Sequence, residues 1–333
     1  MIHRFLILLL IPLGLCGQSG GNTVFSFLDR SIFAGSSALA NTAYLNPTNV
    51  GAYAVQNPLL LTDSNAYQIE ASYGTLGDGI QLMQASAGVN IKGQLLMLGI
   101  QNIGYGTFNQ TDTWGNGLGS FTAGDLAVSV GTKILDFQGW LLGANFKVVN
   151  GSYERYQSWA AATDFALMKR FENAPDVVVM AKNIGGQINA FGDSRESLPA
   201  NLLFAVGDKL KYAPFRWTFV VDQLQRPNLG YDDPNNITVD PITGEETQNN
   251  QDVFNLALRH LSGSLEFLPT TRTHFMLGYS FRRQYEMALP SRRTSGGFTL
   301  GAGMYFDRFT FHFANELRSV AGRMNTVSLG INL

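Results

Sequence analysis

The sequence predicts an all-β fold, a 14-stranded antiparallel transmembrane β-barrel with an N-terminal plug segment. Three observations favour this fold. Apolar and polar residues alternate over many segments, and all the long connections between these segments fall on one side. Charged residues make up only 14% of the 333 residues, against about 25% in typical soluble proteins. A low charge content suits a chain whose outer surface faces lipid rather than water.

The chain begins with MIHRFLILLLIPLGLCGQ, which has the pattern of a secretory signal peptide. Two basic residues precede an apolar run at 5–15, and this run is too short to span a bilayer as a helix. We expect residues 1–17 to be the signal peptide, with cleavage near Gly17 and Gln18. The mature chain would then have no cysteine and no disulfide framework.

The one cysteine, Cys16, allows the alternative of a lipoprotein acylation site. The preceding residue is Leu15, whereas a small residue is expected before an acylated cysteine. This mismatch favours the secretory signal peptide.

Residues 18–65 combine apolar and polar stretches, and their Asn-Pro pairs at 46–47 and 57–58 are typical of turns. A barrel of fourteen strands has an interior too wide for wall side chains alone to fill. We therefore expect this segment to fold into the lumen from the periplasmic side. A flexible periplasmic leader is the alternative.

Residues 66–333 are expected to form the barrel, because their apolar residues recur with a period of two. In FRWTFVVD, for example, Phe215, Trp217 and Phe219 oppose Arg216 and Thr218. One apolar and one polar face is the pattern of a transmembrane β-strand. The predicted strands are 66–75, 80–91, 94–105, 122–134, 140–150, 156–171, 176–184, 201–212, 215–225, 253–268, 273–284, 296–306, 308–317 and 324–333.

The last segment, NTVSLGINL at 325–333, also alternates between apolar and polar residues. A strand at a terminus is normally an exposed edge that invites aggregation. Lipid offers no water to satisfy such an edge, so a spanning sheet has to close. We therefore expect the last strand to pair with the first.

The connections support the same fold. If the first strand runs outward, all inward turns have five residues or fewer, whereas 106–121, 185–200, 226–252 and 285–295 are outward loops. Short periplasmic turns and long external loops are the rule in outer-membrane barrels. The sequence therefore predicts an integral outer-membrane protein with its long loops outside the cell.

Seven charged residues are expected to face the lumen and to form a polar network that lines a path or holds the plug. They are Asp125, Lys147, Asp164, Lys182, Arg216, Asp222 and Arg259.

The 226–252 loop is acidic, and Asp232, Asp233 and Asp240 are weak calcium candidates, since calcium favours clustered oxygen ligands. Their spacing does not match an EF-hand, so a solvated external loop is the simpler interpretation. Arg282–Arg283 and Arg292–Arg293 flank another outer loop, where they could meet anionic lipopolysaccharide or a partner. Solvated flanks of the barrel rim are the alternative for these arginines.

The sequence gives little support for catalysis, a metal or a cofactor. Metal, phosphate-loop and dinucleotide motifs are absent from it. A barrel lipase would need a serine, a histidine and an orienting polar group together. Only Ser328 and His312 suggest such a pair, so we expect no enzyme. A net charge of -2 offers no basic excess for nucleic acid.

Seven segments, in this order and spacing, resemble the PorQ family of outer-membrane barrels, which belongs to the type IX secretion system of the Bacteroidetes. They are GGNTVFSFLDRS, QNPLLL, QNIGYGTF, FTAGDLAVSVG, GANFKVVNGSYERYQSWAAATDFAL, KNIGGQI and LPANLLFAVGDKLKYAP. The chain departs from the family pattern at 29–32, where DRSI replaces Pro-Ser-Ala-Arg, and at the non-aromatic Leu333.

The resemblance implies a barrel similar to the fatty-acid transporter FadL, acting in an attachment complex. This complex processes exported proteins and links them to lipopolysaccharide. Its other members are a PorU-like sortase, a PorV-like shuttle barrel and a PorZ-like surface protein. The barrel's expected role is to anchor the surface protein in the outer membrane.

Two other functions are weighed against this anchoring role. A FadL-like transporter of hydrophobic small molecules would need an apolar pocket in the lumen and a lateral opening at a strand kink. The charged inward faces count against it. A diffusion porin would require residues 18–65 to lie outside the lumen.

Overall fold

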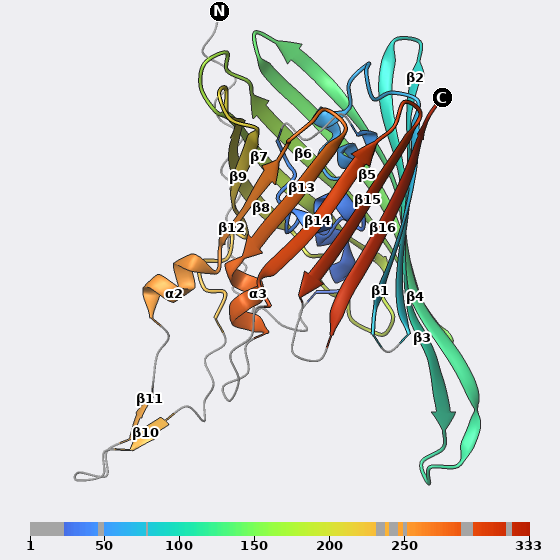
Figure 1. Ribbon diagram of the computed structural model, residues 1–333. Coiled ribbons are helices and arrows are strands. Elements are labelled where there is room, and N and C mark those ends of the chain that lie inside the picture. The colour runs from blue at the N-terminus through green and yellow to red at the C-terminus, as the bar shows by residue number, and fades with distance from the viewer. Residues whose placement is uncertain are drawn as a thin grey trace, which may run out of the picture.

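The computed structural model describes residues 23–45, 50–77, 79–230, 237–239, 246–248, 252–287, 296–317 and 322–333. Fourteen of its strands form a closed antiparallel barrel (Figure 1), which confirms the predicted fold class. β10 (Ile237–Val239) and β11 (Glu246–Gln248) form a separate two-stranded sheet. The expected signal peptide, with Gly17 and Gln18, lies outside the described residues.

Each barrel strand pairs with its neighbour in sequence, except that β9 pairs with β12 and β1 pairs with β16. The strands are β1 (Gln68–Leu76), β2 (Ile80–Ile91), β3 (Gln94–Thr111), β4 (Gly117–Phe137), β5 (Trp140–Tyr153), β6 (Tyr156–Lys169), β7 (Asp176–Asn189), β8 (Asn201–Lys209), β9 (Phe215–Val221), β12 (Leu261–Phe267), β13 (Thr273–Ser280), β14 (Phe298–Tyr305), β15 (Phe309–Leu317) and β16 (Arg323–Asn332).

The period-two pattern decides which side chains face the lumen. On β15, Phe309, Phe311 and Phe313 are exposed on the outer face, whereas Thr310 and His312 are buried in the interior. Side chains of a strand alternate between its two faces, so β15 presents its phenylalanines outward and a mostly polar face inward. This arrangement suits a barrel surrounded by lipid.

β16 closes the barrel against β1, as predicted. The register runs from Gln68 opposite Asn332 to Leu76 opposite Met324, without a shift. The closing strand therefore leaves no edge at this position, as a lipid-embedded sheet requires.

The two ends of the barrel differ (Figure 1). One end, the short-turn end, carries tight connections such as Lys92–Gly93, whose φ angles of 53° and 89° suit a two-residue hairpin turn. The opposite end, the long-loop end, carries the connections 190–200, 222–260 and 281–297. The predicted sorting of loops by length is thus present.

Several predicted boundaries at the long-loop end are wrong; β7, for example, runs to Asn189 rather than 184, and β9 ends at Val221 rather than 225. Residues 106–121 are not a loop, because β3 and β4 continue as a hairpin beyond the barrel (Figure 1). The predicted strand 253–268 begins instead with helix α2 (Val253–Leu258), and the predicted strand 273–284 ends in helix α3 (Phe281–Glu286). The Asp252 side chain accepts a hydrogen bond from the Phe254 N–H at the start of α2, and the Ser280 side chain accepts one from the Arg283 N–H at the start of α3. Such N-caps stabilise the first turn of a helix.

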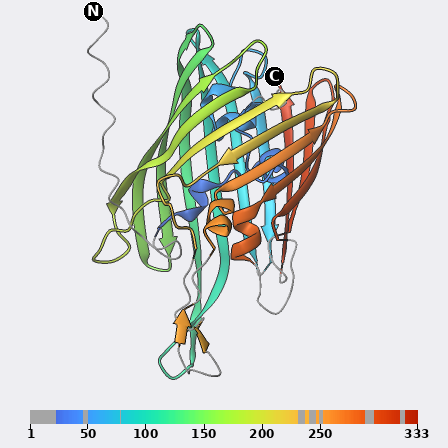
Figure 2. The ribbon, with the colours of Figure 1, turned by 90° about the vertical axis from the view of Figure 1, so that its left-hand side faces the viewer.

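Residues 23–45 and 50–65 lie inside the ring of strands (Figure 2), and we refer to them as the hatch. The hatch contains the short helix α1 (Ala34–Ala38) and three 3-10 turns, η1 (Ser26–Asp29), η2 (Gly51–Val55) and η3 (Pro58–Leu60). α1 packs against β13–β16, whereas η2 and η3 pack against β1–β6. The hatch therefore packs against the inner faces of strands on both sides of the barrel.

The sequence led us to expect that the hatch enters the lumen from the periplasmic side, which is the short-turn end. In the structure the hatch contacts both ends of the barrel. Thr23 bridges to Ser197 at the long-loop end, and residues 63–67 lead into β1 at the short-turn end. The hatch thus runs the length of the lumen from one end to the other.

Candidate functional site in the barrel lumen

Polar wall side chains hold the hatch by its backbone. The N–H groups of Ile32, Ala34 and Gly51 donate to side chains of β2, β16 and β1, and the Ala38 carbonyl accepts from β14. The bonds are Ile32 N to Gln84 Oε1 at 3.0 Å, Ala34 N to Ser328 Oγ at 2.9 Å, Gly51 N to Gln68 Oε1 at 2.7 Å and Thr299 Oγ1 to Ala38 O at 2.7 Å. The buried backbone groups of a short, irregular plug are satisfied in this way.

Apolar packing adds to these bonds. The hatch residues Phe33, Leu39, Leu45, Tyr53 and Leu59 are almost completely buried. Two wall glycines let the hatch backbone approach closely, because a Cβ on Gly301 would collide with Ala38 and one on Gly278 with Ala40. The hatch is therefore fitted to this wall.

Lys147 and Asp164 form the most buried of the predicted charge contacts. Lys147 Nζ lies 2.7 Å from Asp164 Oδ2, and Asp164 Oδ1 also accepts from the backbone N–H of Asn183 at 2.7 Å. Asn183 lies at a register irregularity between β6 and β7, with a φ of 56°. The Asp164 carboxylate thus pairs with the Lys147 ammonium and also accepts the backbone N–H that the β-bulge leaves without a partner strand.

A second cluster joins the wall to the hatch. Asp29 of η1 lies 4.0 Å from Lys182 Nζ and 3.7 Å from Arg282 Nη2, and it accepts from Asn201 Nδ2 at 2.9 Å. Arg282, on α3, also lies 3.2 Å from Asp222 Oδ2. The charges of β7, α3 and the segment after β9 therefore converge on one hatch carboxylate.

Asp222, which directly follows β9, has a raised pKa. The pKa of Asp222 is raised to about 6, chiefly by burial and also by the charge of Asp29, although Arg282, His260 and Lys182 act to lower it. Its charged form is therefore less favoured than that of an exposed aspartate, despite the arginine contact.

Arg216 belongs to a third group, near the short-turn end. Arg216 Nη1 donates to both oxygens of Glu266 at 3.0 and 3.1 Å, and His274 lies 3.5 Å from the same carboxylate. The seven predicted residues therefore do not form one network but divide among separate clusters.

The remaining two predicted residues lie toward the long-loop end. Asp125 accepts from the hydroxyls of Tyr105 and Tyr153 at 2.7 and 2.8 Å. Arg259 does not lie on a strand, because the chain is helical at α2. It caps that helix and packs over the ring of Tyr285 at 5.1 Å.

Two further sequence expectations are changed by the structure. Arg282 and Arg283 do not extend into solvent, because Arg283 lies 3.2 Å from the buried Glu316 and Arg282 contacts Asp29. Ser328 is opposite His312 in register, but its hydroxyl lies 2.7 Å from that of Ser72 and accepts from Ala34. These contacts give Ser328 a structural role under α1.

A cavity of about 540 Å³ opens between the hatch and the wall at the long-loop end, and we refer to it as the vestibule. Wall residues Leu76, Ile80, Leu82, Ile103 and Met324 form an apolar side, joined by hatch residues Phe27 and Ile32. Asp29, Arg30, Arg226, Arg282 and Glu286 form a charged side. The sequence pattern missed the apolar side, because it forms only where residues of β1–β3, β16 and the hatch meet.

The calcium candidates Asp232, Asp233 and Asp240, together with Arg292–Arg293, lie outside the described residues. Within the described part of the chain, no group of histidine, cysteine or carboxylate side chains is arranged to hold a metal. No helix in that part has the length and apolar character needed to cross a membrane.

Solved structures with the same architecture were found by comparison. The Pseudomonas putida toluene transporter TodX matches with a TM-score of 0.55 and 12% identity, covering 92% of this chain and 99% of that one. The monoaromatic hydrocarbon channel CymD matches with a TM-score of 0.51 and 10% identity, over 90% and 97% of the two chains. A Pseudomonas aeruginosa FadL homologue matches with a TM-score of 0.50 and 9% identity, over 90% and 98%.

The chain has the fold of an outer-membrane β-barrel. At these identities the likeness establishes the architecture alone. No protein-family model and no curated protein matches the sequence. The exposed apolar outer face and the closed ring of this barrel agree with an integral position in the outer membrane.

Proposed function

We propose that this FadL-like barrel binds hydrophobic small molecules in the vestibule and transports them. The apolar side of the vestibule carries this proposal, since it supplies the apolar pocket that such a transporter needs. The structural neighbours TodX and CymD are described as a toluene transporter and a monoaromatic hydrocarbon channel. In this arrangement the hatch forms the floor of the pocket.

The proposal is tested with toluene and the purified barrel in detergent. A ligand that binds only the folded state raises the melting temperature by mass action. Toluene is expected to raise it in the wild type and not in Ile103→Arg, which places a long charged side chain in the vestibule. Leu118→Arg is the matched control, because Leu118 lies on the protruding hairpin and is 62% exposed. Equal shifts in all three proteins would show that toluene acts through the detergent and would reject the vestibule.

The second candidate is the anchoring function implied by the PorQ resemblance. Two observations favour it: the packed and hydrogen-bonded hatch fills the lumen, and the β3–β4 hairpin projects well beyond the barrel (Figure 1). In this proposal the barrel holds a PorZ-like surface protein in a complex with a PorU-like sortase and a PorV-like shuttle barrel, close to lipopolysaccharide.

A mild-detergent pull-down of the tagged barrel from its native outer membrane separates the two candidates. Recovery of a large surface protein together with a cysteine protease of the sortase type supports anchoring. A barrel that emerges alone with a bound apolar compound supports transport and rejects anchoring.

A further inference from the structure

The β3–β4 hairpin beyond the barrel rim has two unpaired edges. β2 pairs with β3 only up to Gly104, and β5 pairs with β4 only from Ala123 onward. Beyond these points β3 and β4 pair with each other, from Thr107 opposite Thr122 to Thr111 opposite Gly117. The turn between β5 and β6 touches the hairpin through two bonds, one from the Glu154 N–H to the Thr122 carbonyl and one from Gln110 Nε2 to Glu154 Oε1 at 3.1 Å. Apart from this turn, no described strand lies beside either edge.

Unpaired edges are normally protected in soluble proteins. Lysine, proline and inward-pointing charges prevent a further strand from adding to them. Residues 105–123 contain no lysine, arginine or proline. Register shifts lie at the base of the hairpin, between Gly104 and Thr107, and near its tip, between Gln110 and Thr111. The four pairs between these shifts, from Thr107 opposite Thr122 to Gln110 opposite Gly119, form a regular ribbon.

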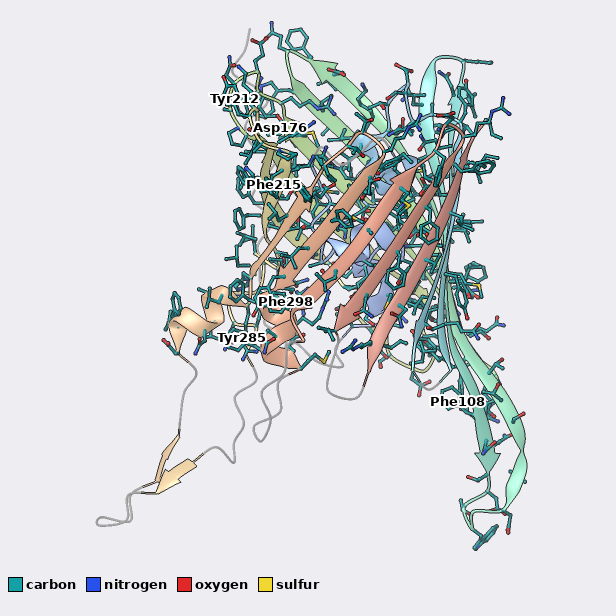
Figure 3. The ribbon with its side chains drawn as sticks, in the orientation of Figure 1. Phe108, Asp176, Tyr212, Phe215, Tyr285 and Phe298 are labelled. Atoms are coloured by element: carbon teal, nitrogen blue, oxygen red, sulfur yellow. The ribbon has the colours of Figure 1, made fainter. Side chains whose placement is uncertain are left out.

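Aromatic side chains accompany these edges. Phe108 stacks on Phe121 with ring centroids 5.4 Å apart, and Figure 3 shows Phe108 on the projecting part of the hairpin. Trp114, at the tip, is 85% exposed. Exposed aromatic residues in a polar setting are typical anchors of protein interfaces.

The charge of the hairpin indicates the kind of partner. Asp112 is the only charged residue in 105–123, and its carboxylate accepts from the N–H groups of Trp114 and Asn116 and from the Asn116 side chain. A nearly neutral ribbon offers no cations for the phosphates of lipopolysaccharide. Free backbone groups would also be unfavourable in lipid, where nothing satisfies them.

We propose that the β3–β4 hairpin is a docking element that takes up an extended, uncharged segment of a surface protein as an additional β-strand. The backbone edge supplies hydrogen bonds, while Phe108, Phe121 and Trp114 supply apolar contacts. This inference rests on the anchoring function and names the element that performs it. It goes beyond ligand binding in the vestibule, which lies between the hatch and the wall.

Hydrogen exchange of the barrel in native outer membranes, compared with the purified barrel in detergent, tests this proposal. An added strand is expected to slow exchange of amides in 105–111 or 117–122 by tenfold or more in the native membrane. The double variant Phe108→Ala/Trp114→Ala is expected to lose this protection. Tyr212→Ala is the matched control, because Tyr212 is 91% exposed at the opposite end of the barrel (Figure 3).

Photo-crosslinking from position 109 in the same membranes identifies the occupant. A protein adduct that requires the two aromatic residues supports the proposal. Equal exchange in membrane and detergent, an adduct with lipopolysaccharide or an adduct with a second copy of this chain overturns it. If the pull-down still recovers a surface protein while the hairpin stays unprotected, anchoring stands and the docking element lies elsewhere.

Discussion

Single residues of the lumen wall show how this barrel accommodates charge beneath its plug. Lys147 and Asp164 face inward from neighbouring strands, and their side chains are only 6% and 1% exposed. A buried charge is tolerated when it is both paired and hydrogen-bonded, and the Asn183 N–H and side chain complete this pair. Removing one partner leaves the other charge buried without compensation.

Lys147→Met is therefore expected to reduce the free energy of unfolding by about 3 kcal/mol or more. Urea unfolding of the barrel in lipid vesicles measures this change. Adding Asp164→Asn, which retains an acceptor for the Asn183 N–H, is expected to restore most of the lost free energy of unfolding.

Lys133→Ala is the matched control, since the ion pair of Lys133 with Asp136 has a distance of 2.7 Å but is exposed to solvent. Its loss is expected to cost less than about 1 kcal/mol. Similar costs for Lys147 and Lys133 would contradict the argument.

Asp222 gives a second prediction, which concerns the pH dependence of stability. The pKa of Asp222 is about 6 in the folded protein, against an ordinary value of 3.8, so the folded state binds more protons between these values. Its contribution to stability therefore falls as the pH rises from about 4 to about 6.

The stability of Asp222→Asn relative to wild type is expected to increase by roughly 1–1.5 kcal/mol between pH 5 and pH 7.5. Urea unfolding at both pH values checks this, and the comparison with wild type cancels the other titrating groups. A difference that stays constant with pH would show that Asp222 remains ionised throughout.

The residue scale also shows what the sequence could predict about the site. Inward-facing residues such as Asp125 and Lys147 follow from strand parity, which is a local property. Their partners do not, because Asp29 lies in the hatch and Arg282 on an unexpected helix, each far along the chain from Lys182 or Asp222. The composition of these charge clusters therefore could not be predicted from the sequence and became clear only from the structure.

At the scale of elements, strands were predictable wherever an apolar face exists. β2 matches its predicted range of 80–91, because Leu82, Gln84 and Ser86 are buried while the residues between them face outward. The projecting part of the β3–β4 hairpin lies outside lipid and has no apolar face of this kind. Its glycines and polar residues suggested a loop, and only backbone pairing makes it a ribbon.

The fit between α1 and the wall gives a prediction at the same scale. In Gly301→Val, the new side chain on β14 would collide with Ala38 and oppose docking of the hatch, and it would also press on the Phe313 carbonyl of the neighbouring strand β15. Overpacking of this kind costs about 1–3 kcal/mol, which would raise the undocked fraction roughly 5- to 150-fold.

Planar-bilayer conductance measures this change, with higher current expected from Gly301→Val than from wild type. Gly186→Val is the matched control, because a Cβ at Gly186 on β7 would meet nothing within 4 Å. A Gly301→Val barrel that folds but conducts no more than wild type would show that the wall, rather than the hatch, adapts.

For the whole molecule, local rules were sufficient to predict closure and loop sorting. Period-two alternation supplies the strands, and the absence of water in lipid then requires the last strand to meet the first. The function could not be predicted in this way, because one architecture serves unrelated functions. The vestibule and the hairpin both depend on contacts between distant segments, and each supports its own candidate function.

The orientation of the barrel in the membrane affects both candidates, because the vestibule and the hairpin lie at the long-loop end. We expect this end to face the exterior of the cell, as long loops do in outer-membrane barrels. Cys16 is the only cysteine and lies in the expected signal peptide, so a single introduced cysteine gives an unambiguous label.

Trp114→Cys and Tyr212→Cys place this label at opposite ends, at positions that are 85% and 91% exposed. A membrane-impermeant maleimide is expected to label Trp114→Cys on intact cells, and Tyr212→Cys only after the outer membrane is opened. Because exposure is nearly equal at the two sites, a difference in labelling reports the side of the membrane. The reverse pattern would place the vestibule and hairpin in the periplasm. Uptake from outside and anchoring of a surface protein would then both be rejected.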